Sequence, residues 1–266
     1  MQKLILVASM FLVTGIVLPS ALVFSTPSVQ EEQETGPVEL ASPRPMTVDD
    51  SLDMDSVGGA LMSPDGEWVL FSKNQLDWEE NERTTKWYMI PSSGGEAFEY
   101  IGEEGGGSFQ FSPDGKYLTL TRSIDGERQV FWMRTAGGEA VQLTEHETSI
   151  GSYQWSDDSS QIFFVATDKR PDDESTMVNE DDDVVFVDEG PNGQNRSYWS
   201  NLWVIDIENQ EISQITDEQF VVGGFDVSPD SARVAFSARY TNRRNDADKN
   251  EIYIVELSSG EISRLT

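Results

Sequence analysis

The chain has 266 residues and carries 48 Asp and Glu against 18 Lys and Arg, so its formal net charge is −30. Binding to nucleic acid requires clustered Lys and Arg, so this charge argues strongly against a nucleic-acid partner and disfavours anionic membrane surfaces. There is no Cys, which removes disulfides, thiolate metal sites and cysteine nucleophiles together. The hydrophobic content of 37% is adequate for a globular core.

Residues 1–25 predict an export signal, because Lys3 precedes a long apolar run that only small or weakly polar residues interrupt. We favour cleavage near Ala21, Val23 or Ser25, although the uncut run is long enough to span a bilayer. The protein is therefore expected to be exported, to the periplasm or outside the cell. It would contact a membrane only if the segment were retained.

Residues 26–50 shift to Pro, Ser, Glu and Gln with little periodicity. Such a composition buries too little apolar surface to offset the entropy of ordering. We interpret this stretch as a flexible linker that precedes the folded repeats of residues 51–266.

One short motif occurs four times after the linker. SPDGEWVLF begins at Ser63, SPDGKYLTL at Ser112, SDDSSQIFF at Ser156 and SPDSARVAF at Ser228. Ser-Pro-Asp-Gly is typical of a tight turn, because Pro fixes φ, Asp hydrogen-bonds nearby backbone and Gly accepts positive φ. The residues after the turn are apolar at every second position, which indicates a strand.

Small residues mark the start of every repeat. Five residues before each motif Ser stand Gly58, Gly107, Gly151 and Gly223, and Gly or Ser follows. We expect another part of the protein to approach the backbone closely there. The expected neighbour is the central channel of a ring, where the first strands of all repeats would converge.

A second hairpin follows in each repeat, and the last three repeats end in Leu-Thr or Ile-Thr, at Thr144, Thr216 and Thr266. Four antiparallel strands per repeat predict an all-β fold, a β-propeller of four-stranded blades. The predicted blades span about residues 57–102, 106–144, 150–216 and 222–266. Four such blades would form an incomplete ring with exposed apolar outer faces, so we expect the chain to be poorly soluble or to associate.

An acidic insertion, residues 168–200, interrupts the third repeat. Its carboxylates include Asp172, Asp173, Glu174, Glu180, Asp181, Asp182, Asp183, Asp188 and Glu189. Clustered carboxylates suit hard cations, so a calcium site is one alternative. Because the spacing does not match an EF-hand loop, we favour a solvated acidic loop and expect no metal and no cofactor.

Candidate chemistry is sparse. The only His, His146, lies just after the second repeat, and no Gly-x-Ser-x-Gly supplies a nucleophile, so we interpret it as a loop residue between blades. Asp65, Asp114 and Asp230 recur once per turn, which favours a structural role.

Two adjacent carboxylates, Glu79 and Glu80, are the candidate substrate-binding residues. They follow Trp78 in an insertion of the first repeat, and acidic groups beside an aromatic ring suit capture of a substrate ammonium group. An exposed polar loop explains the same residues.

The SPDG turns, the closing Leu-Thr, the Gly-Gly-Glu-Ala hairpins and the sequence DDDVVFVDEGPNGQNRSYWSNLWVIDI together resemble a known family. They are similar to the propeller half of secreted prolyl oligopeptidase-family serine peptidases, above all the acylaminoacyl-peptidase and dipeptidyl-peptidase branches. The resemblance covers roughly residues 50–266. The periplasmic propeller of the Tol system uses the same repeat, but the acidic insertion favours the peptidases.

The resemblance implies a propeller that is followed by an α/β-hydrolase domain carrying Ser, Asp and His and that admits short peptides through its channel. No residue here matches the family's catalytic residues, and the chain holds fewer blades than the family's propellers. We therefore expect a truncated, non-catalytic amino-terminal propeller that gates and orients peptide substrates for an absent hydrolase domain. The alternative is a non-catalytic, Tol-like periplasmic propeller that serves as a protein-binding scaffold. The dipeptidyl branch anchors the substrate amino terminus with paired Glu residues, which Glu79 and Glu80 weakly resemble.

Overall fold

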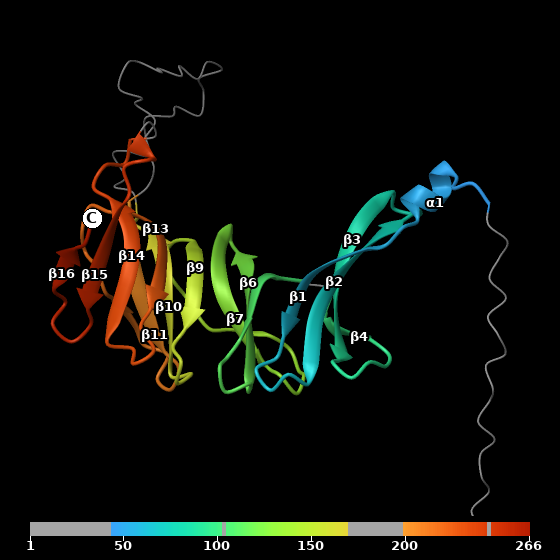
Figure 1. Cartoon of the computed structure of the whole chain (residues 1–266), viewed down its shortest axis with the longest axis horizontal. Helices are drawn as coiled ribbons and strands as arrows, with labels where there is room; N and C mark the ends of the chain where they lie inside the picture. The colour runs from blue at the N-terminus through green and yellow to red at the C-terminus, as the bar shows by residue number, and fades with distance from the viewer. Residues whose placement is uncertain (1–43, 103–104, 170–198, 244–245) are drawn as a thin grey trace, which may run out of the picture. The chain divides into compact units, whose positions relative to one another are not determined.

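The computed structural model describes residues 44–102, 105–169, 199–243 and 246–266 (Figure 1). The predicted export signal, most of the predicted linker and residues 170–198 of the acidic insertion lie outside the described residues. The chain divides into two units, residues 1–45 and 46–266, and the second contains all the elements below.

The second unit is built of antiparallel β-strands in four successive meanders. The first meander is β1 (Ser56–Met62), β2 (Trp68–Asp77), β3 (Glu82–Pro91) and β4 (Phe98–Ile101). The second is β5 (Gly107–Phe111), β6 (Tyr117–Ile124), β7 (Glu127–Arg134) and β8 (Val141–Gln142). The third is β9 (Ile150–Trp155), β10 (Gln161–Thr167), β11 (Ser200–Asp206) and β12 (Ile212–Gln214). The fourth is β13 (Val221–Val227), β14 (Arg233–Arg239), β15 (Glu251–Glu256) and β16 (Ile262–Arg264).

Strands pair with their chain neighbours in every meander, which is the order of a propeller blade. The first two meanders are separate sheets, whereas the third and fourth share one eight-stranded sheet through a single parallel bridge between Ser200 and Val221. The predicted all-β fold of four-stranded antiparallel propeller blades is confirmed.

Helix α1 (Val48–Leu52) was not anticipated, and it overlaps the end of the predicted linker. The side chain of Thr47 accepts a hydrogen bond from the N–H of Asp50 at 3.1 Å, and the N–H of Thr47 donates to the Asp50 carboxylate at 2.8 Å. This reciprocal capping box explains why the helix begins there. No helix in the described part of the chain is long and apolar enough to cross a membrane.

Each predicted turn is closed by its own Ser and Asp. In the second meander, Oγ of Ser112 donates to Oδ1 of Asp114 at 2.7 Å and accepts from the N–H of Tyr117 at 3.0 Å. The same Ser–Asp bond joins the equivalent residues of the other turns, namely Ser63 to Asp65, Ser156 to Asp158 and Ser228 to Asp230. Asp65, Asp114 and Asp230 therefore stabilise their turns, which is the structural role predicted for them.

The small residues at the start of each meander lie beside an irregularity in strand pairing. The pairing of the first strand with the second shifts register near each repeated Gly. A Cβ on Gly223 would lie 3.0 Å from Oγ of Ser237, and one on Gly151 would lie 3.4 Å from the carbonyl oxygen of Val165. The close neighbour is thus the second strand of the same sheet. Convergence of the first strands on a central channel stays a prediction.

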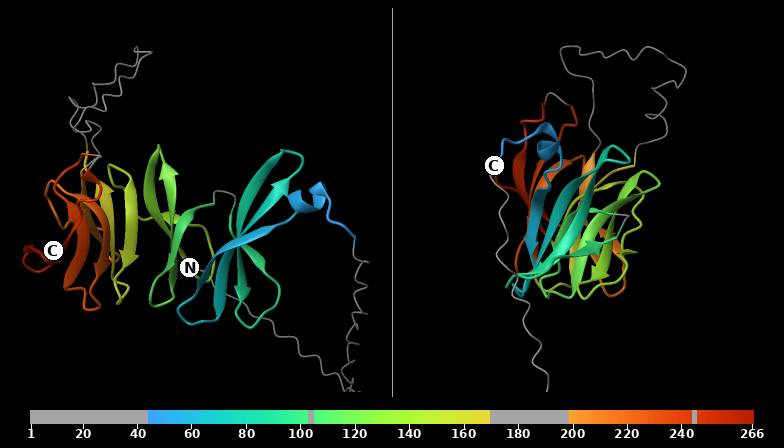
Figure 2. Two further views of the ribbon diagram at one scale, coloured as in Figure 1. Left: turned by 45° about the horizontal axis from the view of Figure 1, so that its top comes forward. Right: turned by 90° about the vertical axis from the view of Figure 1, so that its right-hand side faces the viewer.

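Successive meanders pack face to face through three apolar clusters, and Figure 2 shows the sheets side by side. Leu70 and Met89 of the first meander pack against Leu118 and Leu120 of the second. Polar bonds reinforce the next interface, where Nε1 of Trp155 donates to Oγ1 of Thr119 at 3.0 Å. The core of the unit therefore lies between sheets, as burial of one face per strand requires.

One outer face is less well covered. Leu118, Leu120, Phe131 and Met133 point from the second meander to the first and are only 0, 0, 7 and 5% exposed. The first meander has half-buried residues at the equivalent positions, namely Val69, Phe71, Tyr88 and Ile90. The first meander thus presents a partly exposed apolar face where the second has a buried one.

Candidate functional site

The predicted site residues lie at one end of the sheets. In each meander the Ser-centred turn joins the first two strands at one end, so the hairpin between the second and third strands lies at the other. We call the latter the hairpin end. It carries Glu79 and Glu80, the connection that holds His146, and the start of the acidic insertion at Asp168.

Glu79 and Glu80 lie at the exposed tip of the hairpin between β2 and β3. Their backbone N–H groups both donate to Oδ1 of Asp77, at 2.9 and 3.2 Å, which closes the tip. Nε1 of Trp78 donates to Oδ1 of Asp53 at 2.6 Å, which ties the tip to the segment after α1. Substrate binding by Glu79 and Glu80 stays a prediction.

His146 lies in the connection between β8 and β9, within the loop where the sequence placed it. Its Nδ1 accepts the N–H of Thr148 at 3.2 Å, and its ring centroid lies 4.7 Å from that of Trp203. A pocket of about 470 Å³ opens beside them, lined also by the carboxylates Glu145, Glu147, Asp168 and Asp217. Nε1 of Trp203 is buried with no hydrogen-bond partner among the described residues.

Asp168 is the most perturbed carboxyl group of that pocket. Partial burial raises its pKa above the usual range, and the negative charge of Asp217 adds to the effect. Nδ2 of Asn201 donates to both carboxylate oxygens, at 3.1 Å each, which opposes the rise. Asn201 thus holds the carboxyl group of Asp168 in place where the chain enters the acidic insertion.

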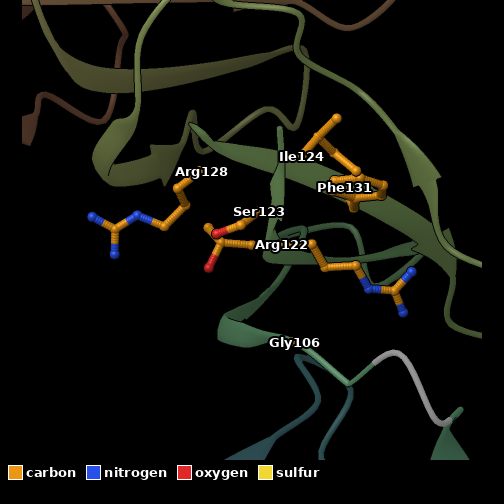
Figure 3. A pocket seen from close by; sticks show the side chains of 7 residues that line it. Gly106, Arg122, Ser123, Ile124, Arg128 and Phe131 are labelled. Carbon is orange, nitrogen blue, oxygen red and sulfur yellow. The ribbon is translucent and has the colours of Figure 1, made fainter. Parts of the chain in front are cut away.

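A larger pocket, of about 610 Å³, lies at the hairpin between β6 and β7 (Figure 3). Its lining consists of Gly106, Thr121, Arg122, Ser123, Ile124, Arg128 and Phe131. Among the described residues, this lining holds two Arg and neither Asp nor Glu, in a chain with 48 acidic residues. Two guanidinium groups in one lining favour an anionic group over a cationic one.

Backbone carbonyls hold both arginines in place. Nε of Arg122 donates to the carbonyl oxygen of Gly105 at 2.9 Å, and its guanidinium lies 5.4 Å from the ring centroid of Phe131. Nε of Arg128 donates to the carbonyl oxygen of Ile150 at 2.7 Å. In Figure 3 the two side chains extend to opposite sides of the hairpin, so they do not form one clamp.

Neither arginine was predicted from the sequence as part of a site. Their position in the sequence could have indicated a binding site, because Arg122 and Arg128 flank the Asp125–Gly126 turn of a hairpin in a strongly acidic chain. Among the described residues, no three His, Asp or Glu side chains are placed to hold a metal ion. The carboxylates of the predicted insertion from Asp172 to Glu189 lie outside those residues.

Comparisons with known proteins point to peptidases. The chain is 26% identical over 220 residues to the uncharacterized peptidase YuxL of Bacillus subtilis, covering 79% of this chain and 34% of that protein. It is 28% identical over 127 residues to dipeptidyl-peptidase 5 of Porphyromonas endodontalis, covering 47% of this chain and 18% of that protein. No protein-family profile matches it.

Among solved structures, acylaminoacyl peptidase from Pyrococcus horikoshii is similar, with a TM-score of 0.52 and 18% identity. That match covers 81% of this chain and 33% of the other. The chain thus spans about a third or less of the length of these peptidases. The comparisons support a propeller of the kind that peptidases carry.

Proposed function

We propose that this chain is the propeller portion of an exported serine peptidase and that it gates and orients peptide substrates. The observation that carries the proposal is the alignment with the peptidase YuxL, which runs through 79% of this chain but only 34% of that protein. The remaining length of such a peptidase would hold the α/β-hydrolase domain. Acyl transfer by Ser, Asp and His belongs to that domain in this proposal.

The hairpin end supports a substrate-facing role. It carries the two pockets described above and the exposed Glu79 and Glu80. Concave sites with a few charged groups on an apolar floor are where proteins bind small ligands. In this proposal, peptides that enter through the propeller meet this end. The predicted export signal would place the protein outside the cytoplasm.

The reading frame beyond the codon for Thr266 tests the proposal. We expect further blade repeats and then a Gly-x-Ser-x-Gly sequence in a predicted strand–turn–helix context. The complete gene product is then assayed on aminoacyl and dipeptidyl chromogenic substrates, with and without a serine-directed fluorophosphonate. Inhibitor-sensitive hydrolysis supports the proposal, whereas a stop codon after a few more blades would overturn it in favour of the scaffold alternative.

A further inference from the structure

The pocket at the hairpin between β6 and β7 has features of a binding site for an extended chain. Strand β5 begins at Gly107, which pairs with Thr121, and no residue of β5 pairs with β6 beyond Thr121. Strand β6 continues, and there Ser123 pairs with Arg128 and Ile124 with Glu127 of β7. Among the described residues, no strand pairs with β6 at Ser123 and Ile124 on the side away from β7, and both residues line the pocket.

An open strand edge offers backbone hydrogen bonds to an added peptide strand. The pocket also offers apolar contact, since Phe131 forms part of its wall and the side chain of Ile124 is 41% exposed. These features suit an extended peptide with an apolar side chain.

The positive charge of Arg128 determines which polar group of a peptide the pocket would favour. Arg128 is exposed, and its Nε is engaged by the carbonyl oxygen of Ile150, which orients the guanidinium plane. A guanidinium has five N–H donors in a fixed fork, so the terminal nitrogens keep donors suited to a carboxylate. Oγ of Ser149 accepts the backbone N–H of Arg128 at 3.1 Å and donates to the carboxylate of Glu127.

We propose that an extended peptide binds along this edge, with a carboxylate at the guanidinium of Arg128 on one face of the hairpin and an adjacent apolar side chain against Ile124 and Phe131 on the other face. This inference rests on the proposed function, because it assigns a substrate class to a propeller that handles peptides. The carboxylate is that of a peptide carboxyl terminus or of an Asp or Glu side chain.

Calorimetric titration of the full chain with three matched peptides tests the proposal. The peptides are N-acetyl-Ala-Ala-Phe with a free carboxyl terminus, the same peptide as its carboxyl-terminal amide, and the amide of N-acetyl-Ala-Glu-Phe. We expect at least one carboxylate peptide to bind about tenfold more tightly than the neutral amide at low ionic strength. The free acid and the Glu peptide distinguish the two sources of the carboxylate.

The variants assign the effect to one residue. Arg128→Gln should abolish the preference for carboxylate, and Arg128→Lys should keep part of it, because Lys retains the charge without the fork. Arg134→Gln is the matched control, since it removes the same charge from the exposed other end of β7. Equal loss in Arg128→Gln and Arg134→Gln would overturn the proposal.

The remaining outcomes are also decisive. Equal binding of all three peptides overturns the carboxylate proposal but leaves peptide handling in place. If none of the three peptides binds, the carboxylate proposal is overturned. The proposed function is tested separately, by the hydrolysis assay on the complete gene product.

Discussion

The hydroxyl group of Thr144 donates a hydrogen bond to Oε1 of Gln129 over 2.9 Å, and both side chains are buried. Oγ1 of Thr144 also accepts the N–H of Val130 at 2.9 Å. The third meander repeats the arrangement with Thr216 and Asn201, at 2.7 Å. The closing Thr of the repeat thus joins the end of a meander to its third strand, which gives the Leu-Thr and Ile-Thr sequences a physical role.

Replacing Thr144 with Val should destabilise the protein by about 1–3 kcal/mol, because the buried Val130 N–H loses its acceptor and Oε1 of Gln129 keeps only the N–H of His146. Thr135→Val is the matched control, since the hydroxyl oxygen of Thr135 is buried without a hydrogen-bond partner in the described ranges. That control should be neutral or slightly stabilising. Chemical denaturation of both variants measures the difference, and equal effects would contradict the role of Thr144.

The turn carboxyl group of Asp114 should make stability depend on pH. Partial burial opposes its charge, but hydrogen bonds from Lys116 and Ser112 outweigh burial and lower its pKa to about 2. Because the folded-state pKa lies below the usual 3.8, the stabilisation is fully present above about pH 4 and is lost as the pH falls toward 2.

Asp114→Asn should therefore lower the melting temperature by roughly 2–4 °C at pH 7 and by less at pH 2.5. Asp157→Asn removes an exposed carboxylate of another turn and serves as the control. Calorimetry at the two pH values checks the difference. A pH-independent loss in Asp114→Asn would show that the charge of Asp114 contributes nothing.

At the tip of the first meander, variants can distinguish the structural role of Asp77 from the predicted binding role of Glu79 and Glu80. Asp77→Asn should destabilise this hairpin, since Oδ1 of Asp77 accepts the N–H groups of Glu79 and Glu80 as a charged acceptor. The double variant E79Q/E80Q should leave the melting temperature unchanged and weaken binding of a peptide with a free amino terminus. Unchanged peptide affinity in E79Q/E80Q would reject the predicted role of these two residues.

The half-buried face of the first meander should drive association of copies. Phe71 and Tyr88 stack there with ring centroids 5.9 Å apart, in the register that is buried in the second meander. Phe71→Glu should reduce self-association by placing a charge on this face, whereas Thr85→Glu, at an exposed position of β3, should not. Sedimentation velocity over a range of concentrations measures the effect. A wild-type chain that stays monomeric would refute the prediction.

Much of the fold was predictable because it depends on short-range contacts. The bond from Ser112 to Asp114 spans two residues, and the alternation after each turn is a property of a single strand. Helix α1 escaped prediction although its capping box is local, because it lies where the composition indicated a linker. The repeated glycines were located correctly, but their neighbour, the second strand of the same sheet, required the observed register shift.

The sequence by itself determined the repeat, its turns and the all-β class, since these follow from residue types a few positions apart. Only the tertiary structure decided which residues share a site. It joins Trp155 to Thr119, 36 positions away, and places Arg128 against the carbonyl of Ile150 in the next meander. Such placements depend on how sheets pack on one another. That packing is set by the combined apolar surface of two meanders, which no single motif encodes.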